Sequence, residues 1–270
     1  MLLRRMVTTA LGLTFFAGAA LAQAHNWQTG LPPAATPVME RIAAFHTELL
    51  VIVTAVFLLL AVLLIFVIVR FNGHKNPQPS KTQHNAALEA AWIIIPVAIL
   101  AVIAWPSFGL LAYEAEIPKA DVTIQATGHQ GHWTYAYPKE GGLQFDSTML
   151  AGAAAKERGE PRLLGVDNPL VVPVNKNVEL IATGADVIHS WAVPAFGVKL
   201  DALPGHLNHT WFKATKIGTY YGQCSELGGT GYAFMPIEVK VVSARDYKVW
   251  LAAAKQKYAG DEPQRVAMND

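Results

Sequence analysis

Three side chains with metal-binding atoms lie in two short segments of the second half of the chain. Cys224 and Met235 belong to residues 220–237 (YYGQCSELGGTGYAFMPI), and His189 belongs to residues 186–207 (DVIHSWAVPAFGVKLDALPGHL). Soft sulfur ligands together with an imidazole suit copper. The residues alone also leave a second interpretation open, in which the cysteine is a buried apolar thiol and the histidine a hydrogen-bonded loop residue.

The region that carries these side chains has the pattern of an all-β domain. Short runs of β-branched and aromatic residues alternate with Gly, Pro, Asn and Asp, which is typical of a sandwich or barrel. Residues 151–168 are expected to form a surface excursion, and residues 244–258 a terminal helix. The candidate ligands fall at strand ends or in loops, so one end of a sandwich would bring them together. The expected strands are residues 121–127, 133–137, 143–149, 177–183, 187–193, 209–214, 218–222 and 234–242.

Two long apolar segments precede this region. Residues 49–69 and 90–111 carry no charged side chain, and each is long enough to cross the hydrocarbon core as a helix, which needs about 20 apolar residues. The remaining chain is too short to bury both as core helices. The two segments therefore predict a transmembrane hairpin, and their sparse polar content predicts that it packs against a larger membrane partner.

The first residues have the pattern of a secretory signal. Arg4 and Arg5 precede an apolar stretch that ends in the small-residue site at residues 22–24, so residues 1–24 are expected to be removed. Export places the new N-terminus outside, and the basic loop between the two spans then lies inside, in accord with the positive-inside tendency. The predicted location is the inner (cell) membrane of a bacterium, with the β domain in the periplasm.

The predicted organisation has four parts. A signal peptide (1–24) is followed by an N-terminal segment with the hairpin (25–113), a β domain (114–243), and a terminal helix with a polar tail (244–270). The formal net charge of +1 gives no indication of a nucleic-acid partner, and a single cysteine excludes an internal disulfide framework.

Several motifs resemble subunit II of haem–copper terminal oxidases of the cytochrome c oxidase type. They are DVIHSWAVP, QCSEL, AFMPI and, at the second span, HNAALEAAW followed by PVAIL. The resemblance covers nearly everything from the first span to about residue 243. It implies a two-helix transmembrane hairpin plus an all-β cupredoxin-like sandwich, and a binuclear copper centre (CuA) that passes electrons from cytochrome c to the haems of subunit I.

The resemblance also shows where this chain departs from the family. The family ligands are an upstream histidine followed by C-x3-C-x3-H-x2-M, which His189, Cys224 and Met235 match, and Glu226 matches the residue whose carbonyl binds one copper. Gly228 stands at the second cysteine and Tyr232 at the second histidine. CuA needs two bridging thiolates, so an ordinary centre is not expected to form.

Four further positions acquire a meaning from the resemblance. Gly131 stands where the family has the tryptophan that accepts electrons from cytochrome c. Glu226 matches a ligand toward a magnesium site shared with subunit I, and Asp201 matches an acid near that interface. Glu89 matches the glutamate at the mouth of the proton path called the K channel. Taken alone, these acids could equally be solvated loop residues or, for Glu89, an acid that favours a helix N-terminus.

The leading interpretation is therefore subunit II of a respiratory oxidase, partnered by a haem-bearing subunit I and by subunit III. Electrons would pass through a residual copper or, as the lost ligands favour, would enter from membrane quinol in place of cytochrome c. The rival interpretation is a non-catalytic copper-handling or oxidase-assembly protein, in which His189, Cys224 and Met235 bind one Cu(I).

Overall fold

The computed structural model describes residues 28–78 and 80–258. These residues form two compact units. Among the described residues, the hairpin unit lies within Arg41–Tyr113, and the β unit consists of residues 28–40 together with residues 114–258. The predicted signal peptide and the end of the polar tail lie outside the described residues.

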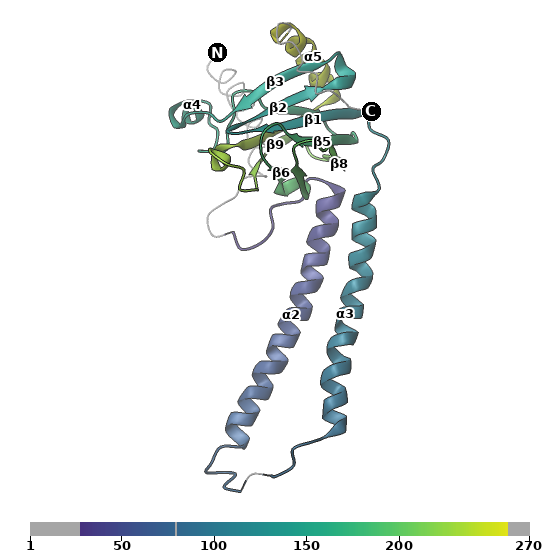
Figure 1. Ribbon diagram of the computed structural model, residues 1–270, viewed down its shortest axis with the longest axis vertical. Coiled ribbons are helices and arrows are strands. Elements are labelled where there is room, and N and C mark those ends of the chain that lie inside the picture. Colours follow the sequence, from purple (N-terminus) through teal and green to yellow (C-terminus); the bar gives the residue numbers. More distant parts are fainter. Residues whose placement is uncertain (1–27, 79, 259–270) are drawn as a thin grey trace, which may run out of the picture. The chain divides into compact units, whose positions relative to one another are not determined.

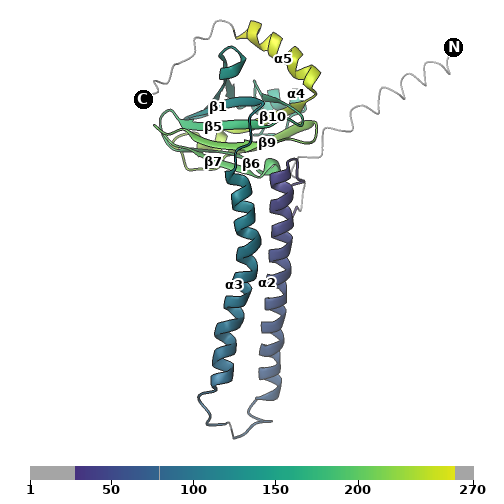
Figure 2. The same cartoon turned by 90° about the vertical axis from the view of Figure 1, so that its right-hand side faces the viewer.

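The hairpin unit contains two helices that are long and apolar enough to cross a membrane. They belong to α2 (Pro37–Arg70) and α3 (Ala86–Ala115), which run side by side in both views (Figures 1 and 2). Each helix is longer than the apolar stretch within it, because polar and small residues continue the helical backbone past both ends. Pro96 and Pro106 lie inside α3, where a missing N–H is tolerated in a membrane helix if other groups satisfy the freed carbonyl. The prediction of two apolar helices is confirmed.

The β unit is a sandwich of two five-stranded sheets, as the sequence predicted. In Figure 2 the sheets are stacked, with β1 and β5 in one layer and β9, β6 and β7 in the other. The first sheet has the order β3-β2-β1-β5-β8 and contains β1 (Val122–His129), β2 (His132–Tyr137), β3 (Leu143–Thr148), β5 (Val178–Gly184) and β8 (Asn208–Phe212). The second has the order β4-β10-β9-β6-β7 and contains β4 (Leu170–Pro173), β6 (His189–Val193), β7 (Val198–Ala202), β9 (Gly218–Cys224) and β10 (Pro236–Val242).

Aromatic side chains fill the space between the sheets. Trp133, Tyr135, Trp191 and Phe212 are fully buried or nearly so, and the Trp191 indole N–H donates to the Tyr135 hydroxyl at 3.3 Å. A large aromatic core of this kind supplies much of the apolar burial that holds two sheets together. It leaves the strand ends and their loops free to build a site.

The structure adds elements that the sequence did not predict. Strands β4 and β7 complete the second sheet, and the excursion at residues 151–168 contains the short helix α4 (Gly152–Glu157). Helix α5 (Ala244–Lys257) is close to its prediction, and the Ser243 side chain caps it by accepting from the Asp246 N–H at 3.1 Å. Three single 3-10 turns are η1 (Pro138–Glu140), η2 (Pro194–Phe196) and η3 (Tyr232–Phe234).

The segment just before α2 is part of the β unit. The Ala35 N–H donates to the Ala195 carbonyl at 3.0 Å, and the Ala35 carbonyl accepts from the Thr215 N–H at 2.9 Å. The hydroxyl of Thr36 donates to the Phe196 carbonyl at 2.6 Å, and both Ala35 and Thr36 are buried. The chain therefore leaves the β unit at the start of α2 and returns to it at the end of α3.

Candidate metal centre

Adjacent strands of the second sheet bring the three candidate ligands to one end of the sandwich. His189 is the first residue of β6, Cys224 is the last residue of β9, and Met235 directly precedes β10. His189 Nδ1 lies 3.9 Å from Cys224 Sγ, and the Cys224 N–H donates to the Met235 carbonyl at 3.0 Å. All three residues are buried. The predicted imidazole and thiol therefore face each other, with the thioether residue on the neighbouring strand end.

A carboxylate that the sequence interpretation missed orients the imidazole. Asp186 Oδ1 lies 2.9 Å from His189 Nε2, and the same side chain accepts from the N–H groups of Gln130 and Val187. Although partial burial acts to raise the pKa of Asp186, these hydrogen bonds outweigh it and lower the pKa to about 2. A charged carboxylate at Nε2 fixes the ring so that Nδ1 points toward the thiol, as is common for metal-binding histidines. The signal in the sequence was an acid three residues before the histidine.

The position of the second family cysteine is closely surrounded. Gly228 is buried, and a Cβ atom added to it would lie 2.5 Å from the Ile188 carbonyl oxygen and 2.9 Å from His189 Nδ1. Real Cβ atoms are not found within 3.0 Å of such atoms. In this structure the imidazole and a backbone carbonyl therefore occupy the space that a second thiolate would need.

Tyr232, at the position of the second family histidine, lies in η3 and is 37% exposed. Phe234 in the same turn is 52% exposed, whereas Trp133 and Trp191 are fully buried packing residues. The turn thus presents two aromatic side chains to the surface.

The turn between β1 and β2 lies beside this loop. Gly131 has a φ of 95°, a conformation that favours glycine, and nothing lies within 4 Å of where its Cβ would be. Gln130 joins the turn to the ligand loop, because its Oε1 accepts from the Thr230 N–H at 3.3 Å. His129 and His132 flank the turn with their rings stacked at a centroid distance of 4.6 Å.

The two other acids of the predicted site have separate surroundings. The carbonyl oxygen of Glu226 lies 3.7 Å from Cys224 Sγ, while its carboxylate accepts from the Leu227 N–H. Asp201, on β7, accepts from the Ser190 hydroxyl at 2.7 Å, and this bond is the main reason that its pKa is lowered. Asp201 is therefore linked to the ligand strand through the residue that follows His189.

Glu89 belongs to the hairpin unit and lies at the start of α3. Its carboxylate accepts from the Asn85 N–H at 3.3 Å and lies 3.6 Å from His84 Nδ1. Asn85 in turn accepts from the N–H groups of Ala87 and Leu88. These contacts are those of a helix N-terminus with a capping residue and an acid in its first turn.

The chemistry that this end of the sandwich can support follows from its donor atoms. A thiolate, an imidazole, a thioether and a backbone carbonyl are donor types that suit a single soft metal ion. The second thiolate that would bridge two copper ions has no counterpart at Gly228. The residues present therefore do not fit a binuclear thiolate-bridged centre.

Comparison with known proteins agrees with this architecture. A family model described as cytochrome c oxidase subunit II, periplasmic domain, matches residues 122–242, and the corresponding transmembrane-domain model matches residues 24–110. The probable cytochrome c oxidase subunit 2 of Rickettsia bellii is 44% identical over 264 residues, covering 97% of this chain and 98% of the relative. Cytochrome c oxidase subunit 2 of Cereibacter sphaeroides is 43% identical over 244 residues, covering 84% and 80%.

A solved structure resembles the β unit. The crystal structure of the periplasmic domain of subunit II of cytochrome oxidase from Bradyrhizobium japonicum is 56% identical in sequence, with a TM-score of 0.50. The match covers 53% of this chain and 99% of that domain.

Proposed function

This chain belongs to the cytochrome c oxidase subunit II family, and we propose that it acts as a subunit II that lacks the family's binuclear CuA centre. A haem–copper oxidase complex is thereby implied, in which subunit I holds the haems and reduces oxygen. The proposal concerns how electrons reach that subunit.

The surroundings of Gly228 carry the proposal. The side chain that would supply the second bridging thiolate is missing, and its space is taken by the His189 ring and the Ile188 carbonyl. The family's second histidine is replaced by the exposed Tyr232. Two coppers cannot share an electron through Cys224 alone, so no electron transfer through a CuA centre is assigned to this chain.

The change at Gly131 supports quinol, rather than cytochrome c, as the electron donor. The family's electron-accepting tryptophan is replaced by a glycine whose backbone conformation disfavours side chains. Loss of the acceptor and of the copper ligands in one chain indicates a divergent subunit that is no longer served by cytochrome c. Electrons from quinol in the membrane would reach the haems without crossing the β unit.

The remaining roles concern assembly and protons. The hairpin docks on subunit I, with subunit III completing the complex in a bacterial inner membrane and the β unit in the periplasm. Glu89 collects protons at the mouth of a path into subunit I. Asp201 and Glu226 lie toward a magnesium site at the shared interface.

Purification of the complex in mild detergent tests the proposal. The preparation should contain haem, should consume oxygen with a quinol donor, and should be inactive with reduced cytochrome c. Its EPR spectrum should lack the seven-line copper hyperfine pattern of a delocalised copper pair. That pattern, or turnover with cytochrome c, would overturn the proposal.

A double variant tests whether the copper pair is prevented by the missing ligand side chains alone or also by the packing of the surrounding loop. Gly228→Cys with Tyr232→His rebuilds C-x3-C-x3-H-x2-M. Because a Cβ at residue 228 meets a backbone carbonyl, the double variant is expected to form the copper pair only if residues 186–189 move away. Formation of the pair at full occupancy without loss of stability would show that the loop was never an obstacle.

A second function is favoured by one distance. The 3.9 Å separation of His189 Nδ1 and Cys224 Sγ leaves room for one Cu(I) between them, which suits a copper-handling or assembly protein. This alternative expects one copper per chain and isolation without a haem-bearing subunit. Co-purification with haem at one subunit I per chain would exclude it.

A further inference from the structure

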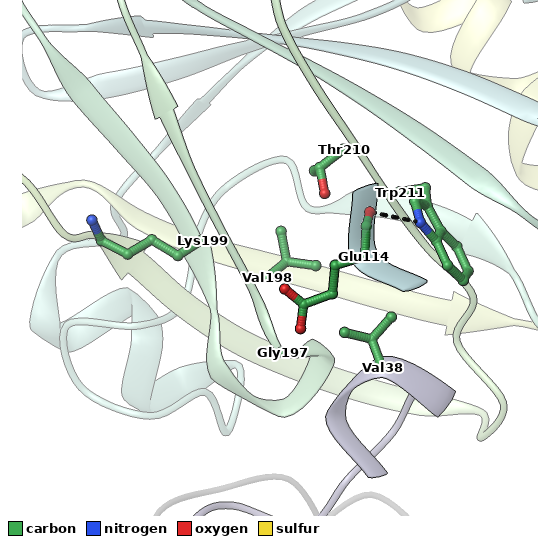
Figure 3. A pocket seen from close by; sticks show the side chains of 7 residues that line it. All are labelled: Val38, Glu114, Gly197, Val198, Lys199, Thr210 and Trp211. Carbon is green, nitrogen blue, oxygen red and sulfur yellow. Dashed lines mark hydrogen bonds between the residues drawn. The ribbon is translucent and has the colours of Figure 1, made fainter. Parts of the chain in front are cut away.

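A hollow of about 70 Å³ lies in the β unit where α3 ends. A single water molecule needs about 10–15 Å³ of such space, so the hollow can hold a small polar group. Figure 3 shows the Glu114 carboxylate turned into it, toward Val198 and Gly197, with Val38 opposite. The lining residues are Val38, Glu114, Gly197, Val198, Lys199, Thr210 and Trp211.

The Glu114 carboxylate has no hydrogen-bond or ion-pair partner among the residues that the structure describes. It is partly buried between valine side chains, and burying an unpaired charge costs free energy. It is also the penultimate residue of α3, whose last turn contains no basic residue. The C-terminal end of a helix carries partial negative charge and favours a cation. A cation in this hollow would therefore be attracted by the carboxylate and by the helix end together.

Trp211 holds this helix end in place. Its indole N–H donates to the Glu114 carbonyl at 3.2 Å, as the dashed line in Figure 3 marks. Carbonyls in the last turn of a helix lack intrahelical partners. The bond thus fixes the backbone from which the carboxylate projects, and the ring adds an apolar wall.

The sequence sets the depth of Glu114 relative to a bilayer. It follows the apolar residues 90–111 by three positions, which corresponds to about 5 Å along a helix. The polar headgroup layer on each side of the hydrocarbon core is about 5–8 Å thick. Glu114 is therefore at the level of the lipid headgroups, whichever face of the membrane this is.

We propose that this hollow binds the primary ammonium group of a phospholipid headgroup, as in phosphatidylethanolamine. The ammonium donates to the Glu114 carboxylate, and Val38 and Val198 contact the adjoining methylene groups. The phosphate stays at the rim, where the Thr210 hydroxyl can donate to it. Lys199 projects away from Glu114 in Figure 3 and lies 3.4 Å from Asp201, so it does not supply a partner for the Glu114 carboxylate.

The lining favours an ammonium group over other cations. Calcium takes six to eight oxygen ligands and magnesium six, whereas Glu114 is the one carboxylate in the lining. Valine walls suit the methylene groups of ethanolamine and supply no metal ligand. A bulkier trimethylammonium group has no N–H with which to bond the carboxylate.

Native mass spectrometry of the full-length chain tests the proposal. The chain is purified from vesicles that contain equal amounts of phosphatidylethanolamine, phosphatidylglycerol and phosphatidylcholine. One phosphatidylethanolamine should be retained per chain, and Glu114→Gln should reduce its retention about tenfold or more, the effect expected for loss of a charged hydrogen bond. Glu116→Gln is the matched control, because Glu116 is exposed and lies outside the hollow.

Three outcomes would overturn the proposal. The first is equal retention of the three lipids by the unaltered chain, a comparison that holds even if the Glu114 variant fails to fold. The second is a folded Glu114→Gln variant that retains phosphatidylethanolamine as well as Glu116→Gln does. The third is retention of phosphatidylglycerol alone, since that headgroup has no ammonium.

Discussion

Substitution of Gly228 by alanine tests whether the imidazole and the Ile188 carbonyl really fill the place of the second family cysteine. Alanine adds only the Cβ atom, so the experiment reports on space and not on metal chemistry. The new atom would start 2.5 Å from the Ile188 oxygen, against an ordinary contact of 3.4 Å or more. Because that oxygen belongs to the backbone, a rotamer change cannot relieve the overlap.

The expected loss of stability follows from this overlap. Forcing an extra carbon into a well-packed site typically costs about 1–3 kcal/mol. For a domain of this size each kcal/mol lowers Tm by about 2–4 °C. Gly228→Ala should therefore lower the Tm of the β unit by several degrees, and it should move the His189 ring away from Cys224.

Thermal unfolding of the full-length chain in mild detergent, followed by near-UV circular dichroism, measures the effect. Gly152→Ala is the matched control, because Gly152 has an ordinary φ and open space around its Cβ position, and it should change Tm little. Gly222→Ala, which would place a Cβ against the Ala192 carbonyl, should cost more than either. If Gly228→Ala has the same Tm as Gly152→Ala, the space beside His189 is open and the structural reason given for the missing centre is wrong.

Three further predictions concern other parts of the chain. Glu89→Ala should slow oxygen consumption by the purified complex several-fold with unchanged haem content, and Glu89→Asp should slow it less. Unchanged turnover of Glu89→Ala with excess artificial donor would show that Glu89 serves only the start of the helix. Burial raises the pKa of Glu238, so its protonated form favours folding below its ordinary value of 4.5, and this contribution is lost as pH rises through the raised pKa. Glu238→Gln should therefore gain stability relative to the unaltered chain between pH 4 and pH 7 in denaturation curves, and no difference between the two pH values would contradict this. Ser243→Ala removes the cap of α5 and should cost about 1 kcal/mol in the same assay, whereas an unchanged value would mean that water replaces the cap.

The architecture could be predicted because it is determined by local patterns. Long uncharged runs identify membrane helices by length alone, and alternation identified most strands of the sandwich. Strand β4 was not predicted, because it has only four residues, all of them buried, and shows no alternation of apolar and polar side chains. Strand β7 is separated from η2 by Gly197 alone, and the sequence around Pro194 and Gly197 resembles a loop. Strand β4 pairs with β10, which is distant in sequence and is not recorded by a local pattern. Strand β7 pairs with the preceding strand β6 at the edge of its sheet.

The candidate site was predictable only in part, for a similar reason. The positions of His189, Cys224 and Met235 follow from motif spacing, and the structure brings the first two within 3.9 Å. The contact of Asp186 with the imidazole depends on the path of the loop before β6. The closeness of Gly228 to Ile188 depends on how two loops pack, and the presence of a glycine does not by itself indicate such packing.

The hydrogen bonds of Ala35 and Thr36 also set an order of events during synthesis. Ala35 is made 180 residues before its partner Thr215, an interval of about 10–40 s at a translation rate of about 5–20 residues per second. Both apolar spans are synthesised early in that interval, whereas Phe196, the partner of Thr36, is made 160 residues after it.

The hydrogen bonds can form only when the segment before α2 and Thr215 are on the same side of the membrane. Completion of the sandwich therefore depends on correct insertion of both helices. In a chain with one span misplaced, Ala35 and Thr36 could not bind the β unit. Such a chain would expose unpaired backbone groups at Ala195, Phe196 and Thr215. The pairing of Ala35 and Thr36 in a domain outside the bilayer therefore reports whether both helices have been inserted correctly.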